Sequence, residues 1–597
     1  MNLHELVSKL IVDSKDSVAL FLPELTLCAT IVAMLLIKVF DFGRRVDVFL
    51  VATVGLLIAL VNAAPWQNLA AERTELFTGM LVYDGFTVFI RSVLLIFALM
   101  FVVFTRLSGI PDSEDGTDIF TLVLGSTLGL CLMASSNHLM MLFMSVEMAS
   151  VPSYALAGML KGRRQSSEAA LKYSIYGAGT AGVMLYGISL IAGLLNTAHF
   201  PTIAIRLAEQ LPTMPAGSVM VLALGGMMLG VGLAFKLSAV PFHFWCPDVF
   251  EGAAAEVNAF LSVASKAGAL ALLVRVAVGF GTFGPGGEAK VAELFNPSEQ
   301  VASAVELKAG DIKSTPTALF FVADKEADKE KVADEKTAPT PTAPAAKAAP
   351  TLKDLAPARD FMAKLIAFIA ILTCTFGNLA AYGQTNIKRL FAYSTIAHAG
   401  YMMMAVPAIL AAVGHPGGEL AARDAVAALC VYIGTYVAMN LGAFAIIAFL
   451  RNAMRSEEIA DYAGLIKRCP LVVICFGIIL FSLVGLPPLA GFWGKFAVFA
   501  SLVESFGAAS KDGQPANYLI WLLVFGGLNT AISLFYYLRI VKVMTIDPES
   551  PTRPPFAAPV GFLPSSYILL VTIPTAIWML CGEYLLKWSE SAASHLF

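Results

Sequence analysis

Charged residues are scarce in this sequence. Only 14% of its 597 residues are Asp, Glu, Lys or Arg, and the formal net charge is −3. Soluble domains carry about 25% charged residues, and domains that bind nucleic acid carry a clear excess of Lys and Arg. The composition therefore excludes an ordinary soluble globular protein and gives no support for a nucleic-acid partner.

Cysteine motifs are also missing. The chain has eight cysteines, and no two of them are spaced as CxxC. Cys469 and Cys475 lie in or beside an apolar run, which is typical of small buried hydrophobic residues rather than zinc or iron–sulfur ligands. The chain also lacks a P-loop and a GxGxxG motif after a strand. We therefore expect no cofactor and no metal ion to be bound by this chain.

Hydrophobic residues make up 58% of the chain, and they occur in long runs. A helix needs about 20 apolar residues to cross about 30 Å of hydrocarbon. The sequence predicts an all-α polytopic membrane protein with about fourteen transmembrane helices. The predicted spans are 22–40, 46–63, 80–104, 119–134, 138–159, 169–195, 218–245, 257–280, 361–381, 388–412, 425–450, 470–502, 517–544 and 564–586.

The loop charges predict an orientation. Loops that follow odd-numbered spans hold more Lys and Arg than the termini and the loops that follow even-numbered spans. Positive residues favour the cytoplasmic side, so we expect both termini on the outer, periplasmic side. The first sixteen residues, MNLHELVSKLIVDSKD, mix charged and apolar residues, and we expect no cleavable signal peptide there.

Residues 283–358 interrupt this pattern. The second half of the segment reads ADKEADKEKVADEKTAPTPTAPAAKAAPTLKDLAP, which has no aromatic residue and is rich in Lys, Glu, Ala and Pro. Such a composition cannot bury enough apolar surface to offset the ordering of the chain. We expect a disordered, outward-facing insertion, and a tether for a neighbouring subunit is the alternative.

Several ionisable residues lie inside predicted spans. A charge at the centre of a bilayer costs about 3 kcal/mol on insertion scales, so such residues are candidates for function. Arg91 and Arg275 are expected to be structural partners of nearby carboxylates. The remaining set lies on six different spans, and we expect it to form a polar row across the bundle: Glu147, Lys172, Lys236, Lys266, His398 and Lys495.

Two predicted spans contain helix breakers. Pro241 lies in FKLSAVPFHFW of the seventh span, and Pro487 and Pro488 lie in SLVGLPPLAGFWGK of the twelfth. Proline removes a backbone donor, and broken helices at membrane depth are tolerated only inside protein or beside a cavity. The two breaks are five spans apart, so spans 4–8 and 9–13 are predicted to be inverted five-helix repeats, each with one broken helix and an ion site near the midplane.

This pattern divides the chain into five parts. We expect helices 1–3 in residues 1–118, a first repeat in 119–282, the insertion in 283–358, a second repeat in 359–545, and helix 14 in 546–597.

Three stretches carry a family resemblance. They are KLSAVPFHFWCPDVFEGA followed by VNAFLSVASKAGAL, then NIKRLFAYSTIAHAGYMM, and then LVGLPPLAGFWGKF. They resemble the antiporter-like subunits of proton-pumping NADH:quinone oxidoreductase, respiratory complex I, in the form of subunit N, the counterpart of mitochondrial subunit 2. The resemblance covers most of residues 20–545. One departure is AAAEVN, where related sequences commonly have prolines, so the role of Glu256 stays open.

The resemblance implies roles for the polar row. Glu147 and Lys236 would be the paired carboxylate and pumping lysine, Lys266 the central relay, and Lys495 the residue that leads to the other half-channel. Lys172 and His398 would be secondary members. The chain would be one subunit of an H⁺-translocating enzyme in a bacterial-type inner membrane. NADH, FMN, iron–sulfur clusters and quinone would belong to partner subunits, and other membrane subunits would be its neighbours.

Three other functions remain open on the sequence. The first is a subunit of a multisubunit Na⁺/H⁺ antiporter or of a membrane-bound hydrogenase. The second is a scaffold whose lysines form static ion pairs, and the third is a secondary transporter of a small solute.

Overall fold

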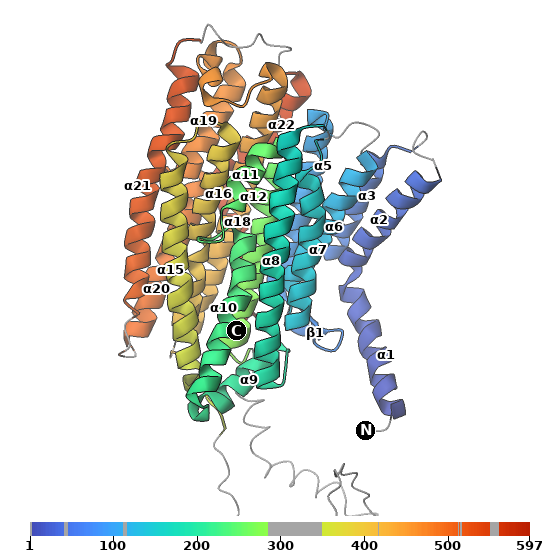
Figure 1. The fold of residues 1–597 in the computed structure, drawn as a ribbon, viewed down its shortest axis with the longest axis vertical. Coiled ribbons are helices and arrows are strands. Elements are labelled where there is room, and N and C mark those ends of the chain that lie inside the picture. Colours follow the sequence, from blue (N-terminus) through green and yellow to red (C-terminus); the bar gives the residue numbers. More distant parts are fainter. Residues whose placement is uncertain are drawn as a thin grey trace, which may run out of the picture. The chain divides into compact units, whose positions relative to one another are not determined.

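The apolar runs of the sequence fold into a bundle of helices (Figure 1). The computed structural model describes residues 3–40, 46–110, 116–160, 162–284, 349–415, 417–511, 513, 516–549 and 560–597. Most of the predicted insertion, residues 285–348, lies outside the described residues, and its disorder stays a prediction. The described residues before the insertion and those from Leu352 onward belong to a single compact unit.

Helices and one two-stranded hairpin make up the part of the chain before the insertion. Its elements are α1 (Leu3–Leu20), α2 (Leu22–Val39), α3 (Val48–Ala63), α4 (Pro65–Asn68), β1 (Thr74–Leu76), β2 (Leu81–Tyr83), α5 (Gly85–Ser108), α6 (Gly116–Ser135), α7 (Leu139–Ala157), α8 (Arg164–Leu195), α9 (Phe200–Gln210), the 3₁₀ turn η2 (Leu211–Thr213), α10 (Ala216–Leu237), α11 (Trp245–Gly252) and α12 (Ala255–Gly281).

The part after the insertion is helical where it is described. Its elements are η3 (Leu352–Leu355), α15 (Ala356–Ala381), α16 (Ile387–Met403), α17 (Ala405–Ala412), α18 (Gly418–Met454), η4 (Ile459–Tyr462), η5 (Leu465–Lys467), α19 (Pro470–Val484), α20 (Ala490–Lys511), α21 (Tyr518–Thr545), α22 (Phe562–Ala576) and α23 (Trp578–Ala593).

The membrane-spanning character of the fold is as predicted. Among the described residues, twelve helices are long and apolar enough to cross a bilayer alone, and they match predicted spans 1–11 and 13. The predicted twelfth span is divided into α19 and α20, and the predicted fourteenth into α22 and α23. Pro574 lies inside α22, two residues before that helix ends, which places this second division next to a helix breaker.

Several predicted boundaries and elements were wrong. The ninth helical segment begins at Leu352 rather than 361, so the end of the predicted insertion 283–358 is helical. Pro357 in the first turn of α15 is a helix-start signal that looked like the end of a Pro-rich linker. The helices α1 and α9 and the hairpin were not predicted, because each is too short or too polar to give a span.

One end of the bundle carries the hairpin and both termini. The Thr78 amide beside the hairpin donates to the Asp13 carboxylate of α1 at 2.8 Å. At the other terminus, α23 packs against α5, whose first turn follows β2 directly. We call this the hairpin end. The loops after α5, α7, α15 and α18 gather around one polar cavity away from the hairpin, and we call that end the vestibule end.

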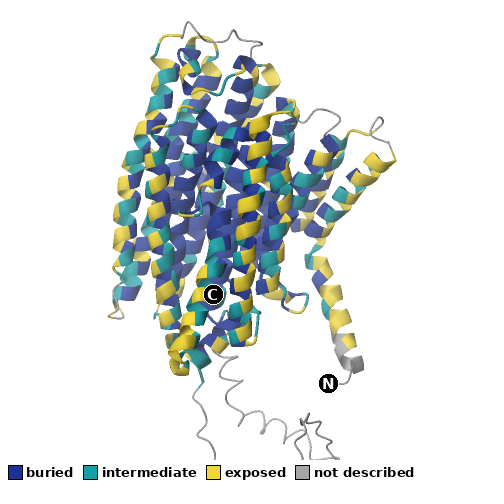
Figure 2. Ribbon diagram, in the orientation of Figure 1, coloured by how far each residue is buried: buried dark blue, intermediate teal, exposed yellow. Residues whose placement is uncertain are grey.

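The helix α12 forms the centre of the fold (Figure 2). It is buried along almost its whole length, whereas only about a third of the apolar stretch of α8, α10 or α21 is buried. It packs on α5, α6, α9 and α10 of the first part and on α15, α16, α17 and α18 of the second part. A residue in the middle of α12 can therefore contact elements of both parts.

Candidate functional site

The first break follows Lys236. The helix α10 ends at Leu237, and Ser238 takes a left-handed conformation with φ 55°, so the helix stops three residues before Pro241 rather than at it. The chain becomes helical again at Trp245, whose indole nitrogen donates to the Phe235 carbonyl at 3.0 Å. Lys236 therefore lies in the last turn of a helix that ends inside the bundle.

The Lys236 amine is buried and faces α7. The side chain is 1% exposed, and its Nζ donates to the Ser150 hydroxyl at 2.9 Å. Glu147 lies three residues earlier on the same helix, and its side chain is half-buried. In the described part of the chain, no ion pair joins Glu147 directly to Lys236. Ser150 is thus the direct neighbour of the amine, and Glu147 lies about one helical turn away.

Lys266 contacts the same break from α12. Its amine donates to the Leu237 carbonyl and to the Ser238 hydroxyl, and it lies 5.6 Å from the centre of the Trp245 ring. The last carbonyls of a helix have no partner within the helix and carry the negative end of its dipole. Lys266 therefore donates a hydrogen bond to the last carbonyl of α10, and Lys236 lies in the last turn of the same helix.

Lys495 does the same at the second break. The helix α19 ends at Val484, and α20 begins at Ala490. The Lys495 amine donates to the carbonyls of Leu483 and Val484 at 3.1 and 2.9 Å. It also lies 4.5 Å from the centre of the Tyr401 ring. Both breaks predicted from proline are therefore present, and a buried lysine caps the helix end at each of them.

His398 lies among tyrosines. Its Nδ1 is 2.9 Å from the Tyr432 hydroxyl, and its Nε2 is 3.2 Å from the Tyr537 hydroxyl. The Tyr537 hydroxyl in turn lies 2.5 Å from that of Ser394. These partners come from α16, α18 and α21, which no local pattern relates. Sequence reasoning therefore missed these hydroxyls, as it missed Ser150 and Ser238.

Lys172 lies apart from the buried lysines. Its side chain is 37% exposed, and its amine pairs with Asp248 at 2.8 Å and with Glu168 at 3.0 Å. Asp248 also pairs with Arg389 at 3.0 Å. Lys172 thus belongs to a charged cluster at the vestibule end, and the structure does not place it with the buried amines of Lys236 and Lys266.

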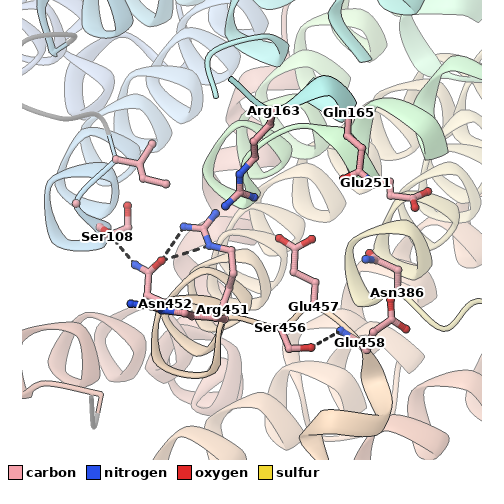
Figure 3. A pocket seen from close by; sticks show the side chains of 13 residues that line it. Ser108, Arg163, Gln165, Glu251, Asn386, Arg451, Asn452, Ser456, Glu457 and Glu458 are labelled. Carbon is pink, nitrogen blue, oxygen red and sulfur yellow. Dashed lines mark hydrogen bonds between the residues drawn. The ribbon is translucent and has the colours of Figure 1, made fainter. Parts of the chain in front are cut away.

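A polar cavity of about 860 Å³ opens beside this cluster (Figure 3). We call it the vestibule. Its lining includes Arg163, Glu251, Arg451 and Glu457 from both parts of the chain. Arg451 pairs with the buried Glu256 at 3.2 Å. Glu256, whose role the sequence left open, is therefore the partner of a vestibule arginine.

Two buried arginines form structural pairs, as predicted. Two Arg275 nitrogens donate to the two Asp84 oxygens at 2.6 Å each, and the Arg91 Nε lies 2.8 Å from a Glu24 oxygen. Both pairs connect different helices. In the part of the chain described, no group of three His, Cys, Asp or Glu residues could hold a metal ion.

Comparison with known proteins decides the family. A model of the family described as "NADH:quinone oxidoreductase/Mrp antiporter, TM" matches residues 136–285 and 348–508, which include both breaks. NADH-quinone oxidoreductase subunit N of Anaeromyxobacter sp. is 34% identical over 96% of each chain. The protein of the same name from Paramagnetospirillum magneticum is 32% identical over 96% of this chain and 97% of its own. The chain belongs to the subunit N family.

Two solved structures have a similar fold. A chain of respiratory complex I from Thermus thermophilus is 27% identical, with a TM-score of 0.63 over 95% of this chain and 98% of its own. A chain of the Mrp complex from Dietzia sp. is 16% identical, with a TM-score of 0.69 over 98% and 97%. At that identity, the second likeness shows the fold alone.

Proposed function

We propose that this chain is a proton-translocating membrane subunit of an NADH:quinone oxidoreductase and that the amines of Lys236, Lys266 and Lys495 carry the protons. The observation behind the proposal is that three buried lysines converge on two broken helix ends. An unpaired helix end supplies carbonyls and dipoles that hold a charge at membrane depth, where it would otherwise cost about 3 kcal/mol.

We assign each residue a separate part. Lys236 would load and release a proton beside Ser150, with Glu147 one turn away as the carboxylate that favours the charged amine. Lys266 would link the two halves of the bundle, because α12 contacts both. Lys495 and His398 would continue the row in the second half. Lys172 is dropped from the row, since its amine lies in an exposed ion pair.

The domain division follows from this assignment. Residues 119–282 and 359–545 would be two inverted repeats, each with one broken helix whose end is capped by a lysine.

The redox reactions, with NADH, FMN, iron–sulfur clusters and quinone, would belong to other subunits. The neighbours of this chain would be other membrane subunits of that complex. Both termini would face the periplasm, because the loops at the vestibule end are the ones rich in Lys and Arg.

The test is Lys236→Ala in the whole complex reconstituted in liposomes, with the number of protons pumped per electron as the readout. We expect a clear decrease. Lys364→Ala is the matched control, because Lys364 is an exposed lysine paired with Asp360 four residues away. Unchanged pumping by the Lys236 variant would contradict the role given to that residue, and a static scaffold would then be the better description.

A subunit of a Na⁺/H⁺ antiporter is the second candidate, because the description of the matching family model also names the Mrp antiporter. Absorbance of flavin and iron–sulfur clusters in the purified native complex separates the two, because only an NADH:quinone oxidoreductase requires them.

A further inference from the structure

An apolar groove on the side of the bundle belongs to neither the lysine row nor the vestibule. It has a volume of about 260 Å³. The helices α10 and α15 form its walls through residues such as Leu222, Gly226 and Phe361, and Val276 and Phe280 of α12 form its floor. Leu207 of α9 closes it at the hairpin end. Every lining side chain is apolar, so no side chain of the groove offers a hydrogen bond to a polar ligand or to water.

The mouth of the groove faces the lipid side of the bundle. Phe361 is 45% exposed and Val219 is 37% exposed, and both line the groove. Leu224 and Met227, on the same stretch of α10, are also exposed. In a membrane protein, such a surface faces hydrocarbon rather than water. The groove is therefore open to the acyl chains of the bilayer.

The length of the groove matches one leaflet. Its lining runs along α10 from Val219 to Leu229, which is about 15 Å at 1.5 Å per residue. Half of the hydrocarbon core is also about 15 Å. The groove begins in the first turns of α10 and α15, at the hairpin end, so it runs from the headgroup level to about the midplane.

Charged side chains lie beside the groove at the hairpin end. Arg206, which precedes the lining residue Leu207, pairs with Glu209, and Lys353 lies four residues before the lining residue Pro357. A slender apolar chain attached to a phosphate fits both the groove and the rim.

We propose that the groove binds one acyl chain of a phospholipid from the leaflet at the hairpin end. The lipid would fill the space between α10 and α15 and so hold both helices against α12, the helix that carries Lys266. The proposal does not depend on the proton path, because it rests on the shape and composition of the groove alone.

Gly226 gives a direct test. A Cβ added at Gly226 meets open space, so a bulky residue there would occupy the groove without a clash at its base. Gly230 lies one turn further along α10, also meets open space, and does not line the groove. Gly226→Phe is therefore the blocking variant, and Gly230→Phe is its matched control.

The probe is a phosphatidylethanolamine with a photoreactive diazirine in the middle of one acyl chain, incorporated into liposomes that contain the whole complex. After illumination, mass spectrometry of the digested chain locates the label. We expect label on peptides that contain residues 219–229 and 357–365. Gly226→Phe should reduce that label severalfold, and Gly230→Phe should leave it unchanged.

Two results would overturn the proposal. They are equal labelling of the Gly226→Phe and wild-type proteins, and label on a neighbouring subunit but not on the groove peptides of the wild-type protein. If the Gly226 variant fails to assemble, Ala358→Phe blocks the opposite wall and gives the same readout. In that case, label at wild-type intensity in the Ala358 variant would contradict the proposal.

Discussion

Lys266 of α12 donates its amine hydrogens to the carbonyl of Leu237, the last residue of α10. A helix end normally exposes four unpaired carbonyls, and a cation near them gains about 0.3–2 kcal/mol from the helix dipole. Lys495 makes the same contact with Val484, the last residue of α19. Two separate helices thus end inside the bundle at a lysine amine.

The two contacts differ in one respect that bears on mechanism. Lys266 comes from a different helix than the break it caps, whereas Lys495 comes from α20, the second half of its own broken helix. A change at the first break can therefore be passed to α12 and to the second part of the chain. A change at the second break acts on the element that carries its own lysine.

Lys266→Ala is expected to reduce proton pumping more than any other single lysine change. It removes both the proton carrier and the cap of α10, while the surrounding helices stay packed. Loss of a site worth about 3 kcal/mol for a buried charge would slow proton transfer by about a hundredfold. The measurement is proton pumping per electron by the reconstituted complex. Lys172→Ala is the control, and an equal effect of both changes would contradict the separation of Lys172 from the row.

The hydroxyl of Tyr432 is expected to support His398. Tyr432→Phe removes one hydrogen-bond partner of the imidazole and keeps the ring. Loss of about 1 kcal/mol of hydrogen bonding would slow a step that uses His398 about fivefold. Single-turnover proton release is the readout. Tyr382→Phe is the control, because that hydroxyl binds the Ile532 carbonyl and not His398. Identical rates for the two variants would remove His398 from the row.

The helical fold was predictable from the sequence. A long, continuous apolar run inside a membrane must satisfy its own backbone hydrogen bonds, and a helix does so. The breaks were predictable from Pro241, Pro487 and Pro488. Their exact position was not, because the left-handed Ser238 ends α10 before the proline is reached. A proline indicates that a helix ends nearby, but the residue that turns the chain depends on packing.

The candidate site was predictable in part. Ionisable residues inside apolar spans pointed to Lys236, Lys266 and Lys495, since charge in a bilayer is costly. The same reasoning grouped Lys172 with the buried lysines as a secondary member, and the sequence could not show that its amine pairs with Asp248. Hydroxyl partners such as Ser150 were not predicted. Serine is common in membrane helices, and it has no free-energy penalty there that would single it out.

The Asp84–Arg275 pair is expected to be essential for stability rather than for pumping. Asp84→Asn leaves a buried guanidinium without its carboxylate, which costs about 3–5 kcal/mol. Asp118→Asn breaks an exposed pair with Lys38 and should cost less than about 1 kcal/mol. The yield of assembled complex and its thermal midpoint are the measurements. A normal yield of the Asp84 variant with reduced pumping would instead place this pair in the proton path.

Glu75 is expected to make the hairpin end sensitive to acid. A hydrogen bond from His199 holds the pKa of the Glu75 carboxyl below its usual range, and the nearby charge of that residue acts in the same direction. The usual pKa of a glutamate, about 4.3, applies to Glu75 in the unfolded state. Because the pKa is lower in the folded state, the carboxylate stabilises the hairpin fully above that usual pKa. The stabilisation is lost as the pH falls through the pKa of the folded state. Because the side chain is 44% exposed, the effect is screened and should be small.

Hydrogen exchange of residues 74–83 in the assembled complex should show faster opening for Glu75→Gln than for wild type at pH 7. The difference should vanish as the pH falls through the lowered pKa of Glu75. Glu72→Gln, at an exposed site in the same loop, should match wild type throughout, and a Glu75 variant that exchanges like wild type at pH 7 would show that His199 does not act through this carboxylate.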